Sequence, residues 1–408
     1  MTLYEELKWR GLIKDVTSPE LENKLNNEKL TFYIGTDPTA DSMHIGHYSS
    51  FLIAKRLAKA GHKPILLIGG ATGRIGDPRP TTEREMKSIE EIEKNTKNLK
   101  KQAEEIFGFE VVDNYDWIQN INIIEFLRDY GKYFNINYML DKDIIRRRLE
   151  TGITFTEFSY MLLQSLDFLH LHETRGVNLQ VAGSDQWGNI TSGVDLIRKK
   201  LGDEVYAFTM PLILDQNGKK FGKSEGNALW LDKNKTSSYE LYQYLINTDD
   251  SMIESYLKVF TFLSPEEIMD IVSKHNNEPH LRLGQKTLAR EIITDLHGKE
   301  EYEKAVQISE NLFSGNIKEI NVNDLMIGLK DVPHFILKDE SLLDLLVNNN
   351  ICSSKREARE FLCNNAISVN GEIINDENMF IDKTKTIEGK IVVIRRGKKK
   401  YYVGLVEE

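Results

Sequence analysis

The amino-acid sequence predicts an α/β protein, in which a parallel sheet covered by helices is followed by an all-helical segment and a small α+β domain. Three short runs are mostly apolar, as buried strands are, and helical patterns lie between them. Apolar residues at successive rather than alternate positions indicate a sheet covered on both faces. Such sheets bind ligands at the carboxyl ends of their strands, so the segments that follow the strands are the first candidates for a site.

The elements of the sheet region follow from hydrophobic periodicity. The first strand, the first helix and the second strand form a βαβ unit that ends at Gly69 and Gly70. The third strand ends in the polar segment 183–188. We expect strands at 30–35, 64–68, 179–182 and near 210–214, and helices at 45–60, 88–102 and 155–171.

The rest of the chain changes its pattern twice. Between residues 237 and 313 apolar residues recur at intervals of three or four, and Pro265 follows Ser264 at an expected helix start. A turn-rich linker at 315–331 then precedes a helix, turn and strand pattern that ends in the apolar run 391–394. At 408 residues the chain exceeds the usual size of a single core. We therefore expect domains at 1–232, 233–330 and 331–408.

The composition argues against a disordered or membrane-spanning protein. Apolar residues make up 40% and charged residues 28% of the chain, without the run of about 18 apolar residues that a span requires. The first residues lack the cationic and apolar regions of a secretory signal, so we expect a cytoplasmic protein that does not bind a membrane. Cys352 and Cys363 have no metal-type partners nearby in the sequence and are expected to be reduced.

The net charge of −10 is unevenly distributed. Residues from Leu342 onward carry a net +1, and the preceding part carries −11. The basic run at 395–400 contains five lysines and arginines. Because phosphate contacts need such residues, the run is a candidate RNA contact. On composition alone, a solvated strand edge is an equally good interpretation.

Residues 37–47, which we call the histidine segment, lie between the first strand and the first helix. Gly35 lets a ligand approach the backbone, and the helix start offers free N–H groups to an anion. His44 and His47 are three residues apart, so both rings project from one face and can donate to phosphate oxygens. A capping or packing pair, or half of a metal site, would have the same spacing. The glycine-rich segment 69–78 is not a P-loop, because no Gly-Lys-Ser/Thr ends it.

Residues 219–224, which we call the lysine segment, contain Lys220 and Lys223. Glycines within and beside the segment suit a mobile loop. An ordinary hairpin with solvated lysines is the better interpretation when the segment is considered alone.

A polar stripe marks the long apolar helix expected at 155–171. Tyr160, Gln164 and Asp167 recur at i, i+4 and i+7, so they share one face of a helix that is otherwise apolar nearly all round. A buried carboxylate and amide must be hydrogen-bonded, either by protein groups or by a polar ligand. A stripe that faces water is the alternative. The stripe is therefore a candidate ligand pocket.

Together the two segments resemble the signatures of class I aminoacyl-tRNA synthetases, in the form of the bacterial-type tyrosyl-tRNA synthetases. The histidine segment is Asp-Pro-Thr-Ala-Asp-Ser-Met-His-Ile-Gly-His, and Lys220 to Ser224 match the mobile lysine loop of the class. Phe221 and Gly222 stand where the wider class often has Met-Ser. The resemblance covers nearly the whole chain. It implies a Rossmann-like catalytic domain, a helical domain and an S4-like RNA-binding domain.

The resemblance also implies an activity and its partners. The carboxylate of L-tyrosine would attack the α-phosphorus of ATP, release pyrophosphate, and pass as a tyrosyl group to the terminal adenosine of tRNA(Tyr). Positioning and charge stabilisation would supply the catalysis, with Mg²⁺ on the ATP phosphates and no metal held tightly by the protein. A homodimer is expected on the same ground.

Residue roles follow from the resemblance. Tyr33 and Asp167 would hold the phenolic hydroxyl of tyrosine, while Tyr160, Gln164 and Asp77 would hold its ammonium group. Asp185 would accept from the ribose of ATP, and Gln186 would contact the reacting carboxylate. The tyrosine set is Tyr33, Asp77, Tyr160, Gln164, Asp167, Gln180 and Gln186. The ATP set is Gly35, Asp37, Gly46, His47, Ser50, Gly183, Asp185 and Lys223. The catalytic set is Thr39, His44, His47, Lys220, Lys223 and Ser224.

The sequence departs from the family at two points. Many relatives carry a Ser-Gly-Lys after the Gly-Asp-Pro turn at residue 78, whereas this chain has Arg79 and Arg84 nearby, and either is a candidate substitute for that lysine. Ile34 replaces a cysteine that often contacts the ribose.

The end of the chain, residues 342–405, resembles an S4-type RNA-binding domain on the strength of the segments 354–359 and 366–371. Its binding would depend on salt and on RNA shape. The residues expected to contact RNA are Lys355, Arg356, Arg359, Arg395, Arg396, Lys398, Lys399 and Lys400. The competing hypotheses are a tryptophan-specific relative and an RNA-binding protein with an inactive synthetase fold.

Overall fold

The computed structural model describes residues 1–78, 85–224, 227–397 and 400–407, with only the main chain of residues 223, 224 and 227. The described residues form two compact units. The first unit comprises Met1–Thr236 and Thr248–Ile292, and the second comprises Ser237–Asn247 and Ile293–Glu408. The division into domains 1–232, 233–330 and 331–408 stays a prediction.

A five-stranded parallel sheet, in the order β3-β2-β1-β4-β5, forms the centre of the first unit. The strands are β1 (Thr31–Thr36), β2 (Lys63–Ile68), β3 (Glu110–Asp113), β4 (Leu179–Gly183) and β5 (Tyr206–Met210). Both faces of the sheet are covered, as residues 65–68 and 179–182 are buried at every position. The parallel sheet predicted from continuous apolar runs is confirmed.

Three predicted strands match the structure to within one residue at each end, and one does not. The strand expected near 210–214 is wrong, because β5 ends at Met210. Pro211 has no N–H to donate to a neighbouring strand. Beyond it the chain forms a hairpin, in which Phe221 N–H donates to the Ile213 carbonyl and Asp215 N–H donates to the Lys219 carbonyl.

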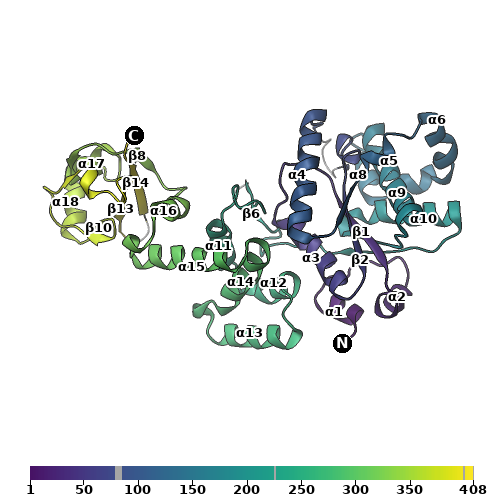
Figure 1. The fold of residues 1–408 in the computed structure, drawn as a ribbon, viewed down its shortest axis with the longest axis horizontal. Helices are drawn as coiled ribbons and strands as arrows, with labels where there is room; N and C mark the ends of the chain where they lie inside the picture. Colours follow the sequence, from purple (N-terminus) through teal and green to yellow (C-terminus); the bar gives the residue numbers. More distant parts are fainter. Residues whose placement is uncertain (79–84, 225–226, 398–399, 408) are drawn as a thin grey trace. The chain divides into compact units, whose positions relative to one another are not determined.

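Four long helices surround the sheet (Figure 1): α3 (Ile45–Lys59), α4 (Ile89–Phe107), α9 (Phe155–Arg175) and α10 (Trp187–Leu201). Local capping fixes their ends. The Thr154 side chain accepts from Glu157 N–H at the start of α9, and Gly176 ends that helix with a left-handed φ of 67°. The helices predicted at 45–60, 88–102 and 155–171 are confirmed, although α4 and α9 continue further than expected.

Shorter elements complete the first unit. They are α1 (Leu3–Trp9), α2 (Leu21–Asn27), α5 (Tyr115–Ile118), α6 (Ile123–Glu125), α7 (Ile136–Leu140), α8 (Asp143–Leu149), β6 (Lys223–Ser224) and β7 (Asn227–Ala228), with the short 3-10 turns η1 (Thr72–Arg74) and η4 (Ser184–Gln186).

The predicted helical segment is also confirmed. Its helices are α11 (Ser238–Ile246), α12 (Ile253–Phe260), α13 (Pro265–Asn277), α14 (Leu283–His297) and α15 (Lys299–Ser314). Pro265 is the first residue of α13, directly after the Ser264 cap, as expected. Helices α12 and α13 belong to the first unit, and α11 and α15 belong to the second.

The second unit contains a mixed sheet in the order β11-β10-β13-β14-β8. Its elements are α16 (Val322–Gly328), β8 (His334–Ile336), β9 (Glu340–Ser341), α17 (Leu342–Asn348), α18 (Lys355–Cys363), β10 (Ile367–Val369), β11 (Glu372–Ile373), β12 (Phe380–Ile381), β13 (Ile391–Arg396) and β14 (Lys400–Leu405). Apolar residues of α17, α18, β10 and β13 share one core. This part has the small α+β character that was predicted.

Over the described ranges of the chain, no helix is both long enough and apolar enough to cross a membrane.

Candidate active site

The predicted site residues of the first unit gather at the carboxyl edge of its sheet. Asp37 follows β1, Gly69 follows β2, Asn114 follows β3 and Ser184 follows β4. Parallel strands bring these segments to the same edge, although they lie far apart in the sequence. Helix α9 crosses here with its polar stripe.

A chain of buried and partly buried hydrogen bonds links the histidine segment to α9. Tyr160 O–H donates to Asp37 Oδ2 at 2.9 Å, and Thr72 O–H donates to Asp37 Oδ1 at 2.7 Å. Asn114 Nδ2 lies 3.0 Å from Thr72 Oγ1 and 3.0 Å from Asp167 Oδ2. Buried polar groups that are cross-linked in this way are held in fixed orientations.

Asp167 is 2% exposed, and both of its oxygens accept hydrogen bonds. Asn114 Nδ2 donates to Oδ2, and Trp117 Nε1 donates to Oδ1 at 2.9 Å. Burial raises the pKa of Asp167 to about 7; these two hydrogen bonds oppose the rise, and the negative charges of Asp37 and Asp113 add to it. The carboxyl group therefore changes its ionisation near neutral pH.

Two polar atoms beside this chain lack hydrogen-bond partners among the described residues. They are the Tyr33 hydroxyl and Gln180 Oε1, both buried on neighbouring strands that pair at these residues. Burial, followed by the charge of Asp167, raises the pKa of Tyr33 well above its ordinary value, so its hydroxyl keeps its proton. An unpaired buried polar atom costs about 1–3 kcal/mol, which a polar ligand would recover.

A second polar cluster lies around Asp77. Its Oδ2 accepts from Gln186 Nε2 at 2.8 Å and its Oδ1 accepts from Asn189 Nδ2 at 3.1 Å. Burial raises the pKa of Tyr160 well above its ordinary value, and the nearby charges of Asp37 and Asp77 contribute. Two predicted tyrosine-binding residues, Tyr160 and Gln186, thus donate to the carboxylates of Asp37 and Asp77 at one edge of the sheet.

His44 and His47 form the cap at the start of α3. Gly46 N–H donates to His44 Nδ1, and His44 N–H donates to His47 Nδ1, each at 3.1 Å. The two rings stack with their centres 3.9 Å apart. A neutral ring whose Nδ1 accepts carries its proton on Nε2, so Nε2 is the atom that can donate to a phosphate. The capping interpretation and the phosphate interpretation are therefore compatible.

Burial, and then the neighbouring His44 ring, lower the pKa of His47 to about 3. The ring of His47 is neutral at physiological pH and stabilises negative charge by hydrogen bonding rather than by a net charge.

The lysine segment lies against the histidine segment. Ile45 N–H donates to the Leu229 carbonyl at 2.9 Å, and Leu229 N–H donates to the Gly222 carbonyl at 3.0 Å. Gly222 has a φ of +82°, and a Cβ at this position would lie 1.8 Å from Ile45 Cγ2. Only glycine fits without displacing the start of α3. The structure thus brings together two segments that are about 175 residues apart in the sequence.

The other predicted site residues of the first unit are less buried than Asp167 and Tyr33. Gly35, Thr39, Asp185 and Lys220 are exposed, and Gly46, Ser50, Gly183 and Gln164 are half-buried. The side chains of Lys223 and Ser224, and all of Arg79 and Arg84, lie outside the described residues.

Sequence reasoning missed Thr72, Asn114, Trp117 and Asn189. Asn114 is 0% exposed and links Thr72 to Asp167. Its signal would have been its place directly after a strand, but the short strand β3 is only partly buried and its apolar pattern is weak.

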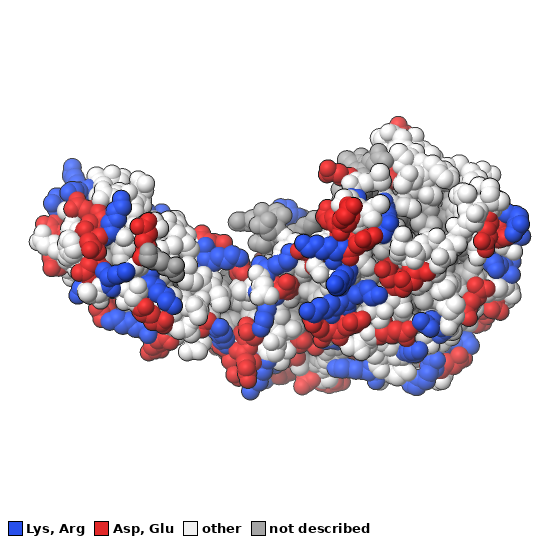
Figure 2. All heavy atoms as spheres, turned by 45° about the horizontal axis from the view of Figure 1, so that its top comes forward, with Lys and Arg blue, Asp and Glu red and all other residues white. Residues whose placement is uncertain are grey.

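In the second unit, two of the predicted RNA-contacting residues are paired with carboxylates. Lys355 forms an ion pair with Asp344, and Arg359 lies 2.6 Å from Glu377. Arg356 is exposed. Figure 2 shows positive and negative side chains interleaved on the visible face of this unit, at the left of the view. Lys398 and Lys399 lie outside the described residues, and Arg395, Arg396 and Lys400 belong to β13 and β14.

Comparisons with known proteins match nearly the whole chain. A family model described as tRNA synthetases class I (W and Y) matches residues 25–314. A second model, described as the tyrosine–tRNA ligase SYY-like C-terminal domain, matches residues 324–404. A tyrosine–tRNA ligase of Macrococcus caseolyticus is 50% identical over 410 residues, covering 98% of each chain. One of Listeria monocytogenes is 49% identical over 415 residues, covering 99% of each chain.

Solved structures share the fold. A C-terminally truncated mitochondrial tyrosyl-tRNA synthetase of Aspergillus nidulans has a TM-score of 0.67 at 34% identity, and the match covers 76% of this chain and 94% of that one. A tyrosyl-tRNA synthetase of Archaeoglobus fulgidus complexed with L-tyrosine has a TM-score of 0.55 at 18% identity, covering 75% of this chain and 100% of that one. The second likeness concerns the fold alone.

Proposed function

Because this chain belongs to the class I tRNA synthetases, and among them to the tyrosine–tRNA ligases, we propose that the buried polar groups between β1 and α9 bind the side chain of L-tyrosine. The enzyme activates L-tyrosine with ATP and transfers the tyrosyl group to tRNA(Tyr). The observation that supports this assignment is the buried Tyr33 hydroxyl, which has no hydrogen-bond partner in the described part of the chain and lies near the Asp167 carboxylate.

The Tyr33 hydroxyl and the Asp167 carboxylate suit a phenol. A tyrosine hydroxyl can donate to Asp167 and accept from the Tyr33 hydroxyl, so each group gains a partner. The phenylalanine side chain would leave both groups buried without that partner. A site of this kind rejects the analogue that lacks the hydroxyl by about 10⁴–10⁵, and the discrimination between tyrosine and phenylalanine by tyrosyl-tRNA synthetase is the standard example. The ammonium group of the substrate would lie near Asp77, Tyr160 and Gln164.

The activation step requires no protein nucleophile. The substrate carboxylate attacks the α-phosphorus of ATP, and pyrophosphate leaves as tyrosyl-adenylate forms. Thr39, the Nε2 atoms of the histidine segment and the lysines of the lysine segment would stabilise the leaving pyrophosphate. A ribose hydroxyl of the terminal adenosine of tRNA then attacks the tyrosyl carbonyl, and AMP leaves.

ATP brings its own metal to this site in our proposal. In the described part of the chain, no group of three His, Cys, Asp or Glu side chains could hold a metal ion. We propose that Mg²⁺ is carried by the phosphates of ATP, where it would add to the charge stabilisation that the lysines supply.

The second unit would bind tRNA through basic residues of α18 and of the β13–β14 hairpin, as an S4-like domain. The exposed side chain of Arg356 supports this role, while Lys355 and Arg359 would exchange carboxylate partners for phosphates. An Arg356→Ala variant should bind tRNA(Tyr) several-fold more weakly and reduce the slope of log affinity against log salt by about 1. An unchanged slope would contradict a phosphate contact.

A homodimer is also proposed. Large apolar side chains are exposed along residues 123–155 of the first unit: Ile123, Ile124, Leu127, Ile136, Tyr138, Leu149 and Phe155. Surfaces of this kind are typical of protein interfaces. An Ile124→Glu variant should shift the molar mass measured by light scattering from dimer to monomer. A wild-type chain that is monomeric at micromolar concentration would contradict the proposal. A cytoplasmic location stays a prediction.

Amino-acid-dependent exchange of pyrophosphate into ATP tests the proposed function. We expect exchange with tyrosine and almost none with phenylalanine or tryptophan. Exchange that depends on tryptophan would favour the tryptophan-specific alternative. A chain without exchange but with intact tRNA binding would favour the inactive RNA-binding alternative.

A further inference from the structure

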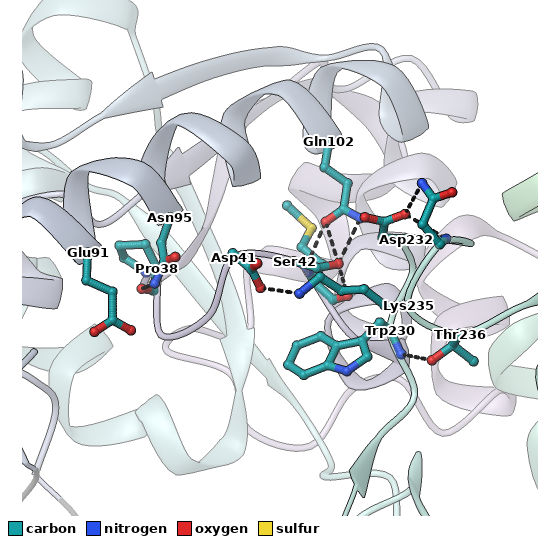
Figure 3. Close-up of polar contacts among 12 residues, drawn as sticks. Pro38, Asp41, Ser42, Glu91, Asn95, Gln102, Trp230, Asp232, Lys235 and Thr236 are labelled. Atoms are coloured by element: carbon teal, nitrogen blue, oxygen red, sulfur yellow. Dashed lines mark hydrogen bonds and ion pairs between the residues drawn. The ribbon is translucent and has the colours of Figure 1, made fainter. Parts of the chain in front are cut away.

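Helix α4 holds the main chain of the histidine segment at two places. Asn95 is 2% exposed and donates from Nδ2 to the Pro38 carbonyl at 3.1 Å. Gln102 Oε1 accepts from Met43 N–H at 2.7 Å, and its Nε2 donates to Ser42 Oγ at 3.1 Å. Figure 3 shows both side chains reaching from α4 to the segment. They fix the loop that carries the proposed catalytic threonine at its start and at its end.

The main chain after the lysine segment holds the histidine segment as well. Leu231 N–H donates to the Met43 carbonyl at 2.8 Å. Since Met43 is 0% exposed, its peptide N–H and carbonyl both need protein partners, and Gln102 and Leu231 supply one each. The residue that directly precedes His44 is therefore fixed by two separate elements.

Lys235, in the chain that follows the lysine segment, adds a side-chain contact with the histidine segment. Its Nζ lies 2.6 Å from Asp41 Oδ1 in the histidine segment, and the two side chains are 34% and 39% exposed. The same Nζ lies 5.4 Å from the centre of the Trp230 ring, which is 6.3 Å from the His44 ring. Figure 3 shows Lys235 between Asp41 and Trp230. The hydrogen bond from Lys235 lowers the pKa of Asp41.

The ion pair of Lys235 and Asp41 can position the histidine segment without contributing much to the stability of the fold. An ion pair as exposed as that of Lys235 and Asp41 contributes little to the stability of a fold. Such a pair can still affect a rate, because a small displacement of a catalytic group lowers the rate steeply. The pair acts on the loop that lies between the two contacts with α4.

We propose that Lys235 and Gln102 are positioning residues for the activation step, which hold the histidine segment from two sides so that Thr39 and His44 meet the phosphates of ATP. They act through the backbone and Asp41 and not on the reacting atoms. The inference rests on the proposed function of the histidine segment.

Another lysine–carboxylate ion pair of the first unit provides the matched control. Lys24 forms an ion pair with Glu28 at 2.7 Å with 28% of its side chain exposed, but it lies on α2. We expect Lys235→Met to lower kcat of tyrosine-dependent pyrophosphate exchange about tenfold, with an unchanged KM for tyrosine, and Lys24→Met to leave both unchanged. Lys235→Arg should retain most of the rate. Equal kcat values for Lys235→Met and Lys24→Met would overturn the role of Lys235.

Gln102 is tested by a pair of substitutions. Gln102→Glu keeps an acceptor for Met43 N–H and should retain most of the exchange rate, whereas Gln102→Leu should lose about tenfold. Thermal unfolding of each variant shows whether it is folded, and if Gln102→Leu is not, the Lys235 variants decide. Equal rates for the two Gln102 variants would overturn its role. A wild-type chain without tyrosine-dependent exchange would instead contradict the proposed function itself, so the two failures are distinguishable.

Discussion

The two sides of the candidate active site are held together in different ways. On the tyrosine side, buried and partly buried side chains hold one another in a chain that runs from Asp37 through Asn114 to Asp167. On the phosphate side, main-chain hydrogen bonds hold two segments together, while Lys220 remains exposed. The difference matches two tasks. Selecting a hydroxyl requires fixed partners in a dry pocket, whereas stabilising a leaving pyrophosphate requires cations that can move with it.

The largest effect is expected on the tyrosine side. Asp167→Ala removes the proposed acceptor of the substrate hydroxyl, and it also removes the acceptor of Trp117 Nε1 and one of the two acceptors of Asn114 Nδ2. We expect the ratio of kcat/KM for tyrosine to that for phenylalanine to fall by about 10³. Pyrophosphate exchange with each amino acid measures it. An unchanged ratio would show that the buried chain is structural and does not select the substrate.

A smaller effect of another kind is expected on the phosphate side. Lys220→Ala and Lys223→Ala should each lower kcat of activation about 100-fold and leave tyrosine binding intact, because their contacts form mainly in the transition state. The neighbouring Lys219→Ala is the control, since its side chain is also exposed and no role is assigned to it. A higher dissociation constant for tyrosine in the first two variants would remove the distinction between the two sides.

A difference in pH dependence is also expected between the tyrosine side and the phosphate side of the site. With a pKa of about 7, Asp167 is an anion above neutrality and gains a proton below it. If the anion is the form that accepts the substrate hydroxyl, KM for tyrosine should rise about tenfold from pH 8 to pH 6, while KM for ATP changes less. The profile should flatten in Asp167→Asn. A wild-type profile that is already flat would mean that Asp167 does not titrate in this range.

The smallest effect concerns the contact between the two segments. Gly222→Ala combines a left-handed φ of +82° with a Cβ 1.8 Å from Ile45 Cγ2, whereas Gly218→Ala has a φ of +75° and open space. We expect the first to cost about 2 kcal/mol and the second about 1 kcal/mol in denaturant unfolding. The difference isolates the contact with α3 from the backbone strain. Equal losses would show that the segment moves aside freely.

Sequence patterns predicted most of the central strands of the first unit correctly. Continuous apolar runs located β1, β2 and β4 to within one residue, because strands buried on both faces leave a strong signal. The strand expected near 210–214 failed because Pro211 interrupts the ladder there. The strands with a clear apolar pattern were therefore predicted correctly. The strand whose end depends on the missing N–H of Pro211 was not.

The candidate site was only partly accessible from the sequence. Tyr160 and Asp167 could be identified from their spacing on an otherwise apolar helix. Asn114 and Trp117 did not, because their importance comes from hydrogen bonds to residues about 50 positions away. Capping by His44 and His47 was one of the alternatives considered, and the structure adds that their Nδ1 atoms are the capping acceptors.

The main-chain hydrogen bonds of Ile45, Leu229 and Leu231 have a consequence for engineering this enzyme. Since the atoms involved are peptide groups, alanine scanning would leave the bonds in place and miss them, whereas a proline scan would remove one donor at a time. The exchange of these three amide hydrogens with deuterium would also report how often the lysine segment separates from α3. Slower exchange upon addition of ATP would record the closing of the loop directly.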